Sequence, residues 1–188
     1  YIAEIKVPQL ENNDQAQSLN AAIREQIEAH AIAMKQQAAD EYQAFMETGG
    51  KAEEYIPARI SINYQLYCNN DQTLSFAIIS TYVRAQSSQT IDCYNVEAGT
   101  GRTLTLEALV GEDYAERIAR EIQRQIDAKP EAEQAVYDED LDLKSMIGPD
   151  RAFHLDPDGN LIVEFEKYEI AVGAAGPQSF TLDLDSLN

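Results

Sequence analysis

Histidine, cysteine and carboxylate side chains are the groups of this chain that could carry out acid–base, nucleophilic or metal chemistry. The chain has two histidines, His30 and His154, and two cysteines, Cys68 and Cys93. Zinc sites need ligands at short spacings such as Cys-x-x-Cys or His-x-x-x-His, and the sequence has neither. It also lacks the Gly-x-Ser-x-Gly turn that exposes a hydrolase nucleophile. We therefore expect no catalytic residue, no metal ligand and no cofactor.

One short motif resembles half of a calcium loop. Asp156, Asp158 and Asn160 alternate as the first ligands of an EF-hand do. However, Gly159 falls at position four instead of six, and position twelve is Lys167 instead of glutamate. We interpret the segment as a tight turn that joins two strands.

The charge balance limits the classes of partner. The chain carries 33 acidic and 14 basic residues, a net charge of -19. Nucleic acids and anionic membrane surfaces are bound by lysine and arginine, so both are unfavourable partners. A basic protein remains compatible with this charge. Solubility through mutual repulsion is the simpler explanation of the same charge.

The N-terminal half predicts a long helix lying across a sheet. A stripe of apolar residues at helical spacing runs from Leu19 to Phe45, and the helix should extend from Gln15 to Thr48, before Gly49. Alternating patterns predict an opening strand over residues 2–10 and an antiparallel meander with strands over residues 60–68, 74–83 and 90–96. The middle strand is apolar on both faces, which is typical of a central strand.

The meander also predicts that the two cysteines are not bonded to each other. Cys68 should lie opposite about Thr73, whereas Cys93 should lie opposite about Ile79. This offset corresponds to ~20 Å along a strand, which is far beyond disulfide reach.

The C-terminal half predicts a second helix followed by a hairpin and a further strand. Ile118, Ile122 and Ile126 share one helical face, and Lys129-Pro130 ends that helix. The hairpin spans residues 153–165, and the last strand spans residues 180–184. We expect one α+β domain over residues 1–188, with an N-terminal segment 1–97 and a C-terminal segment 98–188. Its long helix should pack on a mainly antiparallel sheet.

Three segments resemble a known family, and together they cover nearly the whole chain. One is the long N-terminal helix followed by alternating strands, and the other two lie further along the chain. The first of these two is Gly99-Thr100-Gly101-Arg102-Thr103-Leu104-Thr105-Leu106-Glu107-Ala108-Leu109, which resembles the family pattern Thr-Gly-x-x-Leu-x-Leu-x-Asp-Leu. The second, more specific pattern is matched by Phe153, Leu155, Gly159, Leu161, Phe165, Tyr168, Glu169, Ile170, Ala171, Ala174, Ala175 and Gly176. The family is the extracytoplasmic domain of unknown function of lysozyme-sensing, sigma-V-type anti-sigma factors. It also occurs beside peptidoglycan deacetylase domains and in bacterial lipoproteins.

This resemblance implies a non-catalytic, extracytoplasmic sensor or binding domain of a membrane-anchored bacterial envelope protein. It implies no cofactor, and membrane attachment only through an N-terminal anchor outside this sequence. The partner would be a basic, lysozyme-like protein or a cell-wall glycan. The alternative is an accessory domain of a peptidoglycan-modifying enzyme such as a deacetylase.

The resemblance places the binding residues at Tyr168, Glu169, Val172 and Gly173. Family members often have Pro-Tyr where this chain has Val172-Gly173, and a Gly-Gly-Ala-His-Gly stretch where it has residues 84–89. We therefore expect weak or absent lysozyme binding, decreasing with added salt. The structural alternative is that Tyr168 is a buried phenol and that Glu169 ties the adjacent loop.

Overall fold

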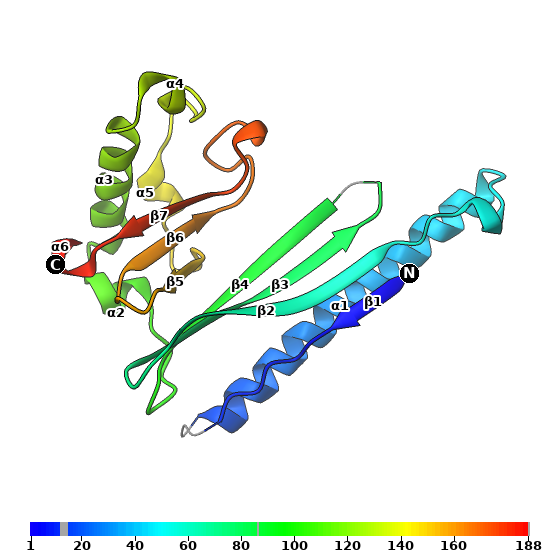
Figure 1. The fold of residues 1–188 in the computed structure, drawn as a ribbon, viewed down its shortest axis with the longest axis horizontal. Coiled ribbons are helices and arrows are strands. Elements are labelled where there is room, and N and C mark those ends of the chain that lie inside the picture. The colour runs from blue at the N-terminus through cyan, green and yellow to red at the C-terminus, as the bar shows by residue number, and fades with distance from the viewer. Residues whose placement is uncertain (12–14, 86, 188) are drawn as a thin grey trace. The chain divides into compact units, whose positions relative to one another are not determined.

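The protein has an α+β fold, as the sequence predicts (Figure 1). The computed structural model describes residues 1–11, 15–85 and 87–187. The chain divides into two compact units. Unit 1 comprises Tyr1–Leu66, Phe76–Asp92 and Gly99–Gly101, and unit 2 comprises Tyr67–Ser75, Cys93–Ala98 and Arg102–Asn188.

A mixed sheet with the strand order β1-β2-β3-β4 is the framework of unit 1. Its strands are β1 (Ile2–Ile5), β2 (Arg59–Asn69), β3 (Thr73–Val83) and β4 (Ser87–Glu97). β1 pairs with β2 in parallel. β3 has a neighbour on each side, which confirms the central position predicted from its two apolar faces. The three long strands contribute residues to both units.

The long helix α1 (Ala16–Glu47) packs on this sheet through the predicted apolar stripe. Its buried residues are Ile23, Ile27, Ala31 and Ala38. Near the C-terminal end of the helix, Ala38 belongs to a cluster with Ile60 of β2 and Tyr82 of β3. Gly49 follows the helix with a φ of 87°, a conformation that favours glycine. A short 3-10 turn, η1 (Ala52–Glu54), leads into β2.

The opening strand is shorter than predicted. The sequence predicts a strand within residues 2–10 that ends near Pro8, but β1 already ends at Ile5. The following segment is held by α1 instead of by the sheet. The Asn20 side chain accepts a hydrogen bond from Leu10 N at 2.7 Å and donates one to Leu10 O at 2.8 Å. A helix side chain therefore satisfies the backbone groups that a longer strand would have paired.

Unit 2 is built from short helices and a second sheet. The helices are α2 (Leu106–Val110), α3 (Tyr114–Asp127), α4 (Glu131–Gln134), α5 (Leu143–Met146) and α6 (Leu184–Leu187). The strands β5 (Phe153–Leu155), β6 (Leu161–Phe165) and β7 (Gln178–Leu182) form an antiparallel sheet in that order, with η2 (Gly173–Ala175) before β7. These elements confirm the predicted second helix and hairpin. The closing strand is also present, but it lies two residues earlier than the predicted 180–184, because Leu184 begins α6. None of the described helices is long and apolar enough to cross a bilayer.

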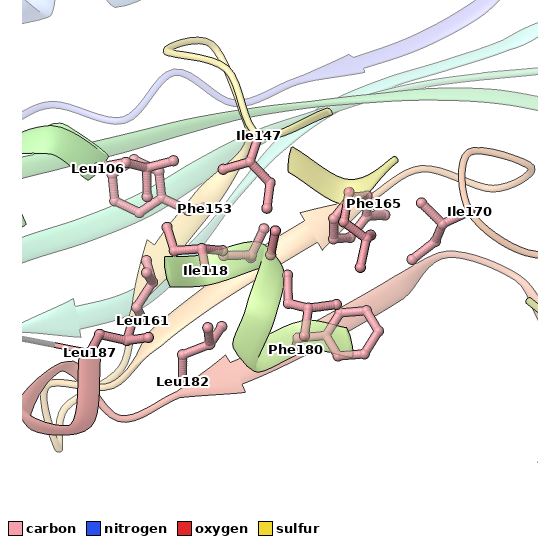
Figure 2. Close-up of a cluster of buried hydrophobic side chains, with 14 of the residues drawn as sticks. Leu106, Ile118, Ile147, Phe153, Leu161, Phe165, Ile170, Phe180, Leu182 and Leu187 are labelled. Carbon is pink, nitrogen blue, oxygen red and sulfur yellow. The ribbon is translucent and has the colours of Figure 1, made fainter. Parts of the chain in front are cut away.

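The core of unit 2 lies between α3 and the three-stranded sheet. Ile118 and Ile122 of α3 are fully buried, as are Leu161 and Val163 of β6. Figure 2 shows Ile118 among side chains from β5, β6 and β7. The 3.6-residue period of α3 and the two-residue period of the strands thus supply one continuous apolar cluster.

The segment that resembles a calcium loop is a hydrogen-bonded turn. Asp156 Oδ1 accepts from the backbone N–H groups of Asp158 and Asn160, each at 2.9 Å. Gly159 adopts a φ of 85° and lets the chain reverse. The carboxylate of Asp156 therefore caps the β5–β6 connection.

Side chains, instead of another strand, satisfy the outer edge of β5. Ser75 Oγ accepts from Leu155 N at 3.0 Å and donates to Asn95 Oδ1 at 2.6 Å. Asn95 Nδ2 donates to Phe153 O at 2.8 Å. Both polar side chains are buried and lie in unit 2 with β5. Their burial is tolerated because each makes the hydrogen bonds that β5 needs.

Cys68 and Cys93 are not bonded to each other, as the meander predicts. Cys68 Sγ lies 3.7 Å from Thr73 O, next to the turn between β2 and β3. Burial raises the pKa of the Cys68 thiol, with the nearby Asp156 carboxylate adding to the effect. This thiol is therefore a poor nucleophile at neutral pH.

Candidate functional site

Unit 1 brings together a serine, a histidine and an aspartate, the residue types of a hydrolase triad. His30 Nδ1 lies 3.0 Å from Ser80 Oγ and 3.6 Å from Asp92 Oδ2. In a triad the aspartate contacts one ring nitrogen and the serine contacts the other. Here both partners face the same nitrogen, and Ser80 is buried. The group is therefore not arranged for nucleophilic catalysis. The sequence pattern had not indicated that Ser80 and Asp92 lie next to His30.

His154 of β5 forms a second histidine–carboxylate pair, in unit 2. Its Nδ1 lies 3.3 Å from Glu164 Oε1, and its ring stacks on that of Tyr67 with centroids 3.6 Å apart. Burial lowers the pKa of His154 and raises that of Glu164. Burial, together with Cys93 and Glu164, raises the pKa of Tyr67 to about 12. The phenol is therefore protonated at neutral pH.

The strand pairing explains this pair, which residue spacing alone did not reveal. His154 is opposite Ile162 in the β5–β6 register, so Glu164 is its diagonal neighbour on the same face. The turn over Asp156–Asn160 can be predicted from the sequence. Pairing the two strands outward from this turn would have placed His154 and Glu164 close together. The Tyr67 phenol next to the His154–Glu164 pair stays protonated at neutral pH and is not activated as a nucleophile. We therefore assign the pair a packing role.

We expect His154 to titrate below the ordinary histidine value of about 6.5. The folded protein then binds this proton more weakly than the unfolded chain does, so His154 lowers stability as the pH falls below about 6.5. Histidine ring resonances followed by NMR across pH 4 to 8 measure the midpoint, and His154→Gln identifies the signal. A midpoint at or above about 6.5 would mean that attraction to Glu164 outweighs burial.

The residues implied as a binding site gather in one loop after β6. Tyr168 is 70% exposed and has a φ of 73°, the left-handed conformation that is uncommon for an aromatic residue. A Cβ added to Gly173 would lie 1.8 Å from the Tyr168 ring, so the ring sits directly against that glycine. Val172 is exposed beside it. The prediction of a buried phenol is therefore wrong, because the ring covers a glycine at the surface.

Glu169 anchors this loop, as the structural alternative predicted. Its carboxylate accepts from Arg151 Nη2 at 2.5 Å and from Glu166 N at 2.7 Å. Burial pushes the pKa of Glu169 upward, but the hydrogen bonds from Arg151 and Glu166 N outweigh it and leave the pKa below its usual value. Glu169 therefore stabilises the loop, while Tyr168 and Val172 are the exposed side chains that a partner could contact.

Arg151 carries most of the polar contacts behind the loop. It donates to Met146 O through Nε at 2.9 Å and Nη2 at 2.6 Å, and to Glu164 O at 3.2 Å. Its guanidinium lies 4.6 Å from the centre of the Phe165 ring. One planar cation thus ties the end of α5, strand β6 and Glu169 together.

The same loop is hydrogen-bonded to an acidic segment, residues 131–142, which begins with α4. Val172 N donates to Val136 O at 2.8 Å, and Asp138 N donates to Ile170 O at 3.1 Å. Residues 131–142 contain six carboxylates and no basic side chain. The exposed Tyr168 loop and this acidic segment therefore belong to one hydrogen-bonded surface.

A hollow of about 400 Å³ opens beside the acidic segment. It is lined by four carboxylate residues, together with Ile126, Tyr137 and other residues of α3 and α4; the four are Asp127, Glu131, Asp138 and Glu139. No lysine or arginine lines it among the residues described. Within that part of the chain, no group of histidine, cysteine or acidic side chains is close enough to hold a metal ion. The hollow is suited to a cationic side chain.

Charge is distributed unevenly between the two units. Unit 2 has 22 acidic and 8 basic residues, a net charge of -14. Unit 1 has 11 acidic and 6 basic residues, a net charge of -5. The exposed loop and the hollow thus lie in the unit that carries most of the negative charge.

Comparisons with known proteins identify a related family and fold. Residues 107–185, less than half of the chain, match a family described as Protein of unknown function (DUF3298). A DUF3298 member from Bacteroides fragilis has a similar crystal structure, with a TM-score of 0.61 and 15% identity over 89% of this chain and 67% of that chain. A Pseudomonas aeruginosa member has a TM-score of 0.48 and 14% identity, over 80% and 67%. No curated protein matches.

Proposed function

We propose that this chain is a non-catalytic binding domain that receives a basic protein at the Tyr168–Gly173 loop and the adjoining acidic hollow. The observation that carries the proposal is Tyr168 itself. Its ring is 70% exposed at a left-handed backbone position. Such a conformation costs of order 1–3 kcal/mol and tends to occur at functional sites. Tyrosine is also one of the residue types that are enriched at interface hot spots.

The support behind Tyr168 favours a preformed site. Glu169 and Arg151 fix the chain on one side, and the hydrogen bonds to Val136 and Asp138 fix it on the other. A loop held in this way loses little conformational entropy when a partner binds. The family match over residues 107–185 includes the whole loop.

The acidic hollow favours a protein with exposed lysine or arginine over a neutral glycan. Four carboxylates face a space of about 400 Å³ with no cation in its lining among the described residues. The net charge of unit 2 would accelerate encounter with a basic partner, and added salt would weaken that attraction. From the sequence resemblance, we further propose that the domain acts outside the cytoplasmic membrane, in an envelope protein that senses this partner.

Calorimetry at low salt tests the proposal with three probes: lysozyme, the unrelated basic protein cytochrome c, and chitotetraose as a neutral glycan. We expect weak binding of lysozyme that decreases with salt. Tyr168→Ala should reduce its affinity roughly tenfold or more, as for a hot-spot aromatic residue. Gly173→Ala should also weaken binding, because its added Cβ displaces the Tyr168 ring.

Tyr64→Ala is the matched control, since Tyr64 is also exposed but lies on β2 in unit 1. It should leave binding unchanged. Equal binding of lysozyme by the native chain and Tyr168→Ala would show that only general charge attraction operates. Binding of chitotetraose that Tyr168→Ala removes would show that the loop recognises glycans instead.

A further inference from the structure

The outer edge of strand β4 is exposed over the first part of the strand. β4 is the last strand of the four-stranded sheet, with β3 on one side. On its other side, Val96 forms a bridge with Thr103, so the edge is already occupied at the C-terminal end of the strand. Its residues 87–92 belong to unit 1, and those from Ser87 to Thr90 are exposed. A strand with one unpaired side presents a row of backbone donors and acceptors that another strand can join.

The two edges of this sheet differ in their protection. β1, at the other edge, is four residues long, carries Glu4 and is followed by Lys6 and Pro8. Short length, charge and proline are the devices that prevent edge-to-edge pairing. β4 is eleven residues long and has no charged residue, proline or glycine from Ser87 to Ile91. The fold thus guards the β1 edge, whereas no other described strand covers residues 87–92 at the β4 edge.

The nearest charge on β4 does not guard its edge. Asp92 points to α1, where its Oδ2 lies 3.6 Å from His30 Nδ1. On the other face, Gln89 Nε2 donates to Thr81 Oγ1 of β3 at 3.2 Å. Asp92 is therefore held on one face of the sheet and Gln89 on the other. Neither side chain extends from the strand edge, where it could repel an incoming strand.

We propose that this edge is an interface on which β4 of a second copy pairs in antiparallel fashion, centred on Thr90. In that register Thr90 faces Thr90 of the other copy, Gln89 faces Ile91, and Ser88 faces Asp92. No like charges are opposed, so the strand is complementary to itself. The resulting two-fold dimer would have a continuous sheet and would leave the Tyr168 loop out of the paired strands.

The charge distribution sets the salt dependence of this dimer. Pairing uses unit 1, with a net charge of -5, but each copy also carries the -14 of unit 2. Repulsion between copies is long-range, and added salt screens it. Dimerisation should therefore strengthen with salt, whereas binding of a basic protein should weaken.

Light scattering after size-exclusion chromatography tests the proposal over a hundredfold range of protein concentration, at low and high salt. The native chain should show a mass that rises from 21.0 kDa toward twice that value, and more so at high salt. Thr90→Lys should remain monomeric, because it places two lysines opposite each other at the centre of the interface. Ile32→Lys adds the same charge at an exposed position of α1 and should dimerise like the native chain.

Three outcomes would overturn the proposal. A constant mass of 21.0 kDa at every concentration and salt level would show that the edge stays unpaired. Equal dimerisation of the native chain and Thr90→Lys would place the interface elsewhere. Loss of the dimer in Ile32→Lys as well would show that added charge acts generally and not through β4.

Discussion

Replacing Ile27 with aspartate should lower the free energy of unfolding by about 3 kcal/mol or more. Ile27 lies on the inner stripe of α1 and is 1% exposed. The substitution removes an apolar side chain from the helix–sheet contact. It puts a carboxylate into an apolar space that was not built around a hydrogen-bond donor or a positive charge. Either the charge stays buried at high cost, or the carboxyl takes up a proton and still lacks its hydrogen bonds.

Urea denaturation followed by circular dichroism measures this change. Ile32→Asp is the matched control, because it makes the same substitution on the same helix at a residue that is 68% exposed. The control should change the unfolding free energy by no more than about 0.5 kcal/mol. Equal effects of the two variants would contradict the packing of α1 through the Ile23–Ala38 stripe.

Replacing Arg151 with methionine should cost about 2–4 kcal/mol of stability and should disorder the Tyr168 loop. The Arg151 side chain is 13% exposed and its Glu169 partner is 25% exposed. Methionine fills much of the space, but Glu169 Oε1, Met146 O and Glu164 O lose the hydrogen bonds that Arg151 donates. The loss is therefore larger than the net contribution of the ion pair itself.

Arg120→Met is the corresponding control, because Arg120 pairs with Glu116 on α3 and the two side chains are 72% and 55% exposed. An exposed pair contributes about 1 kcal/mol or less. Thermal denaturation compares the two variants, and amide hydrogen exchange over residues 166–174 reports on the loop. If Arg151→Met leaves that exchange unchanged, Arg151 does not support the candidate site.

Periodic patterns account for the elements that could be predicted from sequence. The stripe on α1 and the alternation in β2 and β3 are repeated over many residues, so their helix and strand periods are unambiguous. β1 was predicted too long because its pattern continues past Ile5, whereas the backbone of Leu10 finds its partner in the Asn20 side chain. That contact depends on tertiary structure, which a local pattern does not contain.

The candidate site was located by sequence resemblance, but the roles of its residues required coordinates. Nothing in the residue order indicates that Tyr168 adopts a left-handed conformation and covers Gly173. The hydrogen bonds from Val172 to Val136 and from Asp138 to Ile170 join segments more than thirty residues apart. The lack of an aromatic residue at positions 172 and 173 suggested a loop without an anchor, but the fold supplies Tyr168 at the same place.

Chemical-shift mapping tests most directly whether this loop is the binding surface. The ¹⁵N-labelled chain is titrated with unlabelled lysozyme at low salt, and the change of each backbone amide signal is recorded. We predict that the largest changes fall on residues 166–174 and 131–141, and that Tyr168→Ala strongly reduces them at the same lysozyme concentration. Largest changes on α1 or on the four-stranded sheet, or the same changes in Tyr168→Ala, would contradict the proposed binding site.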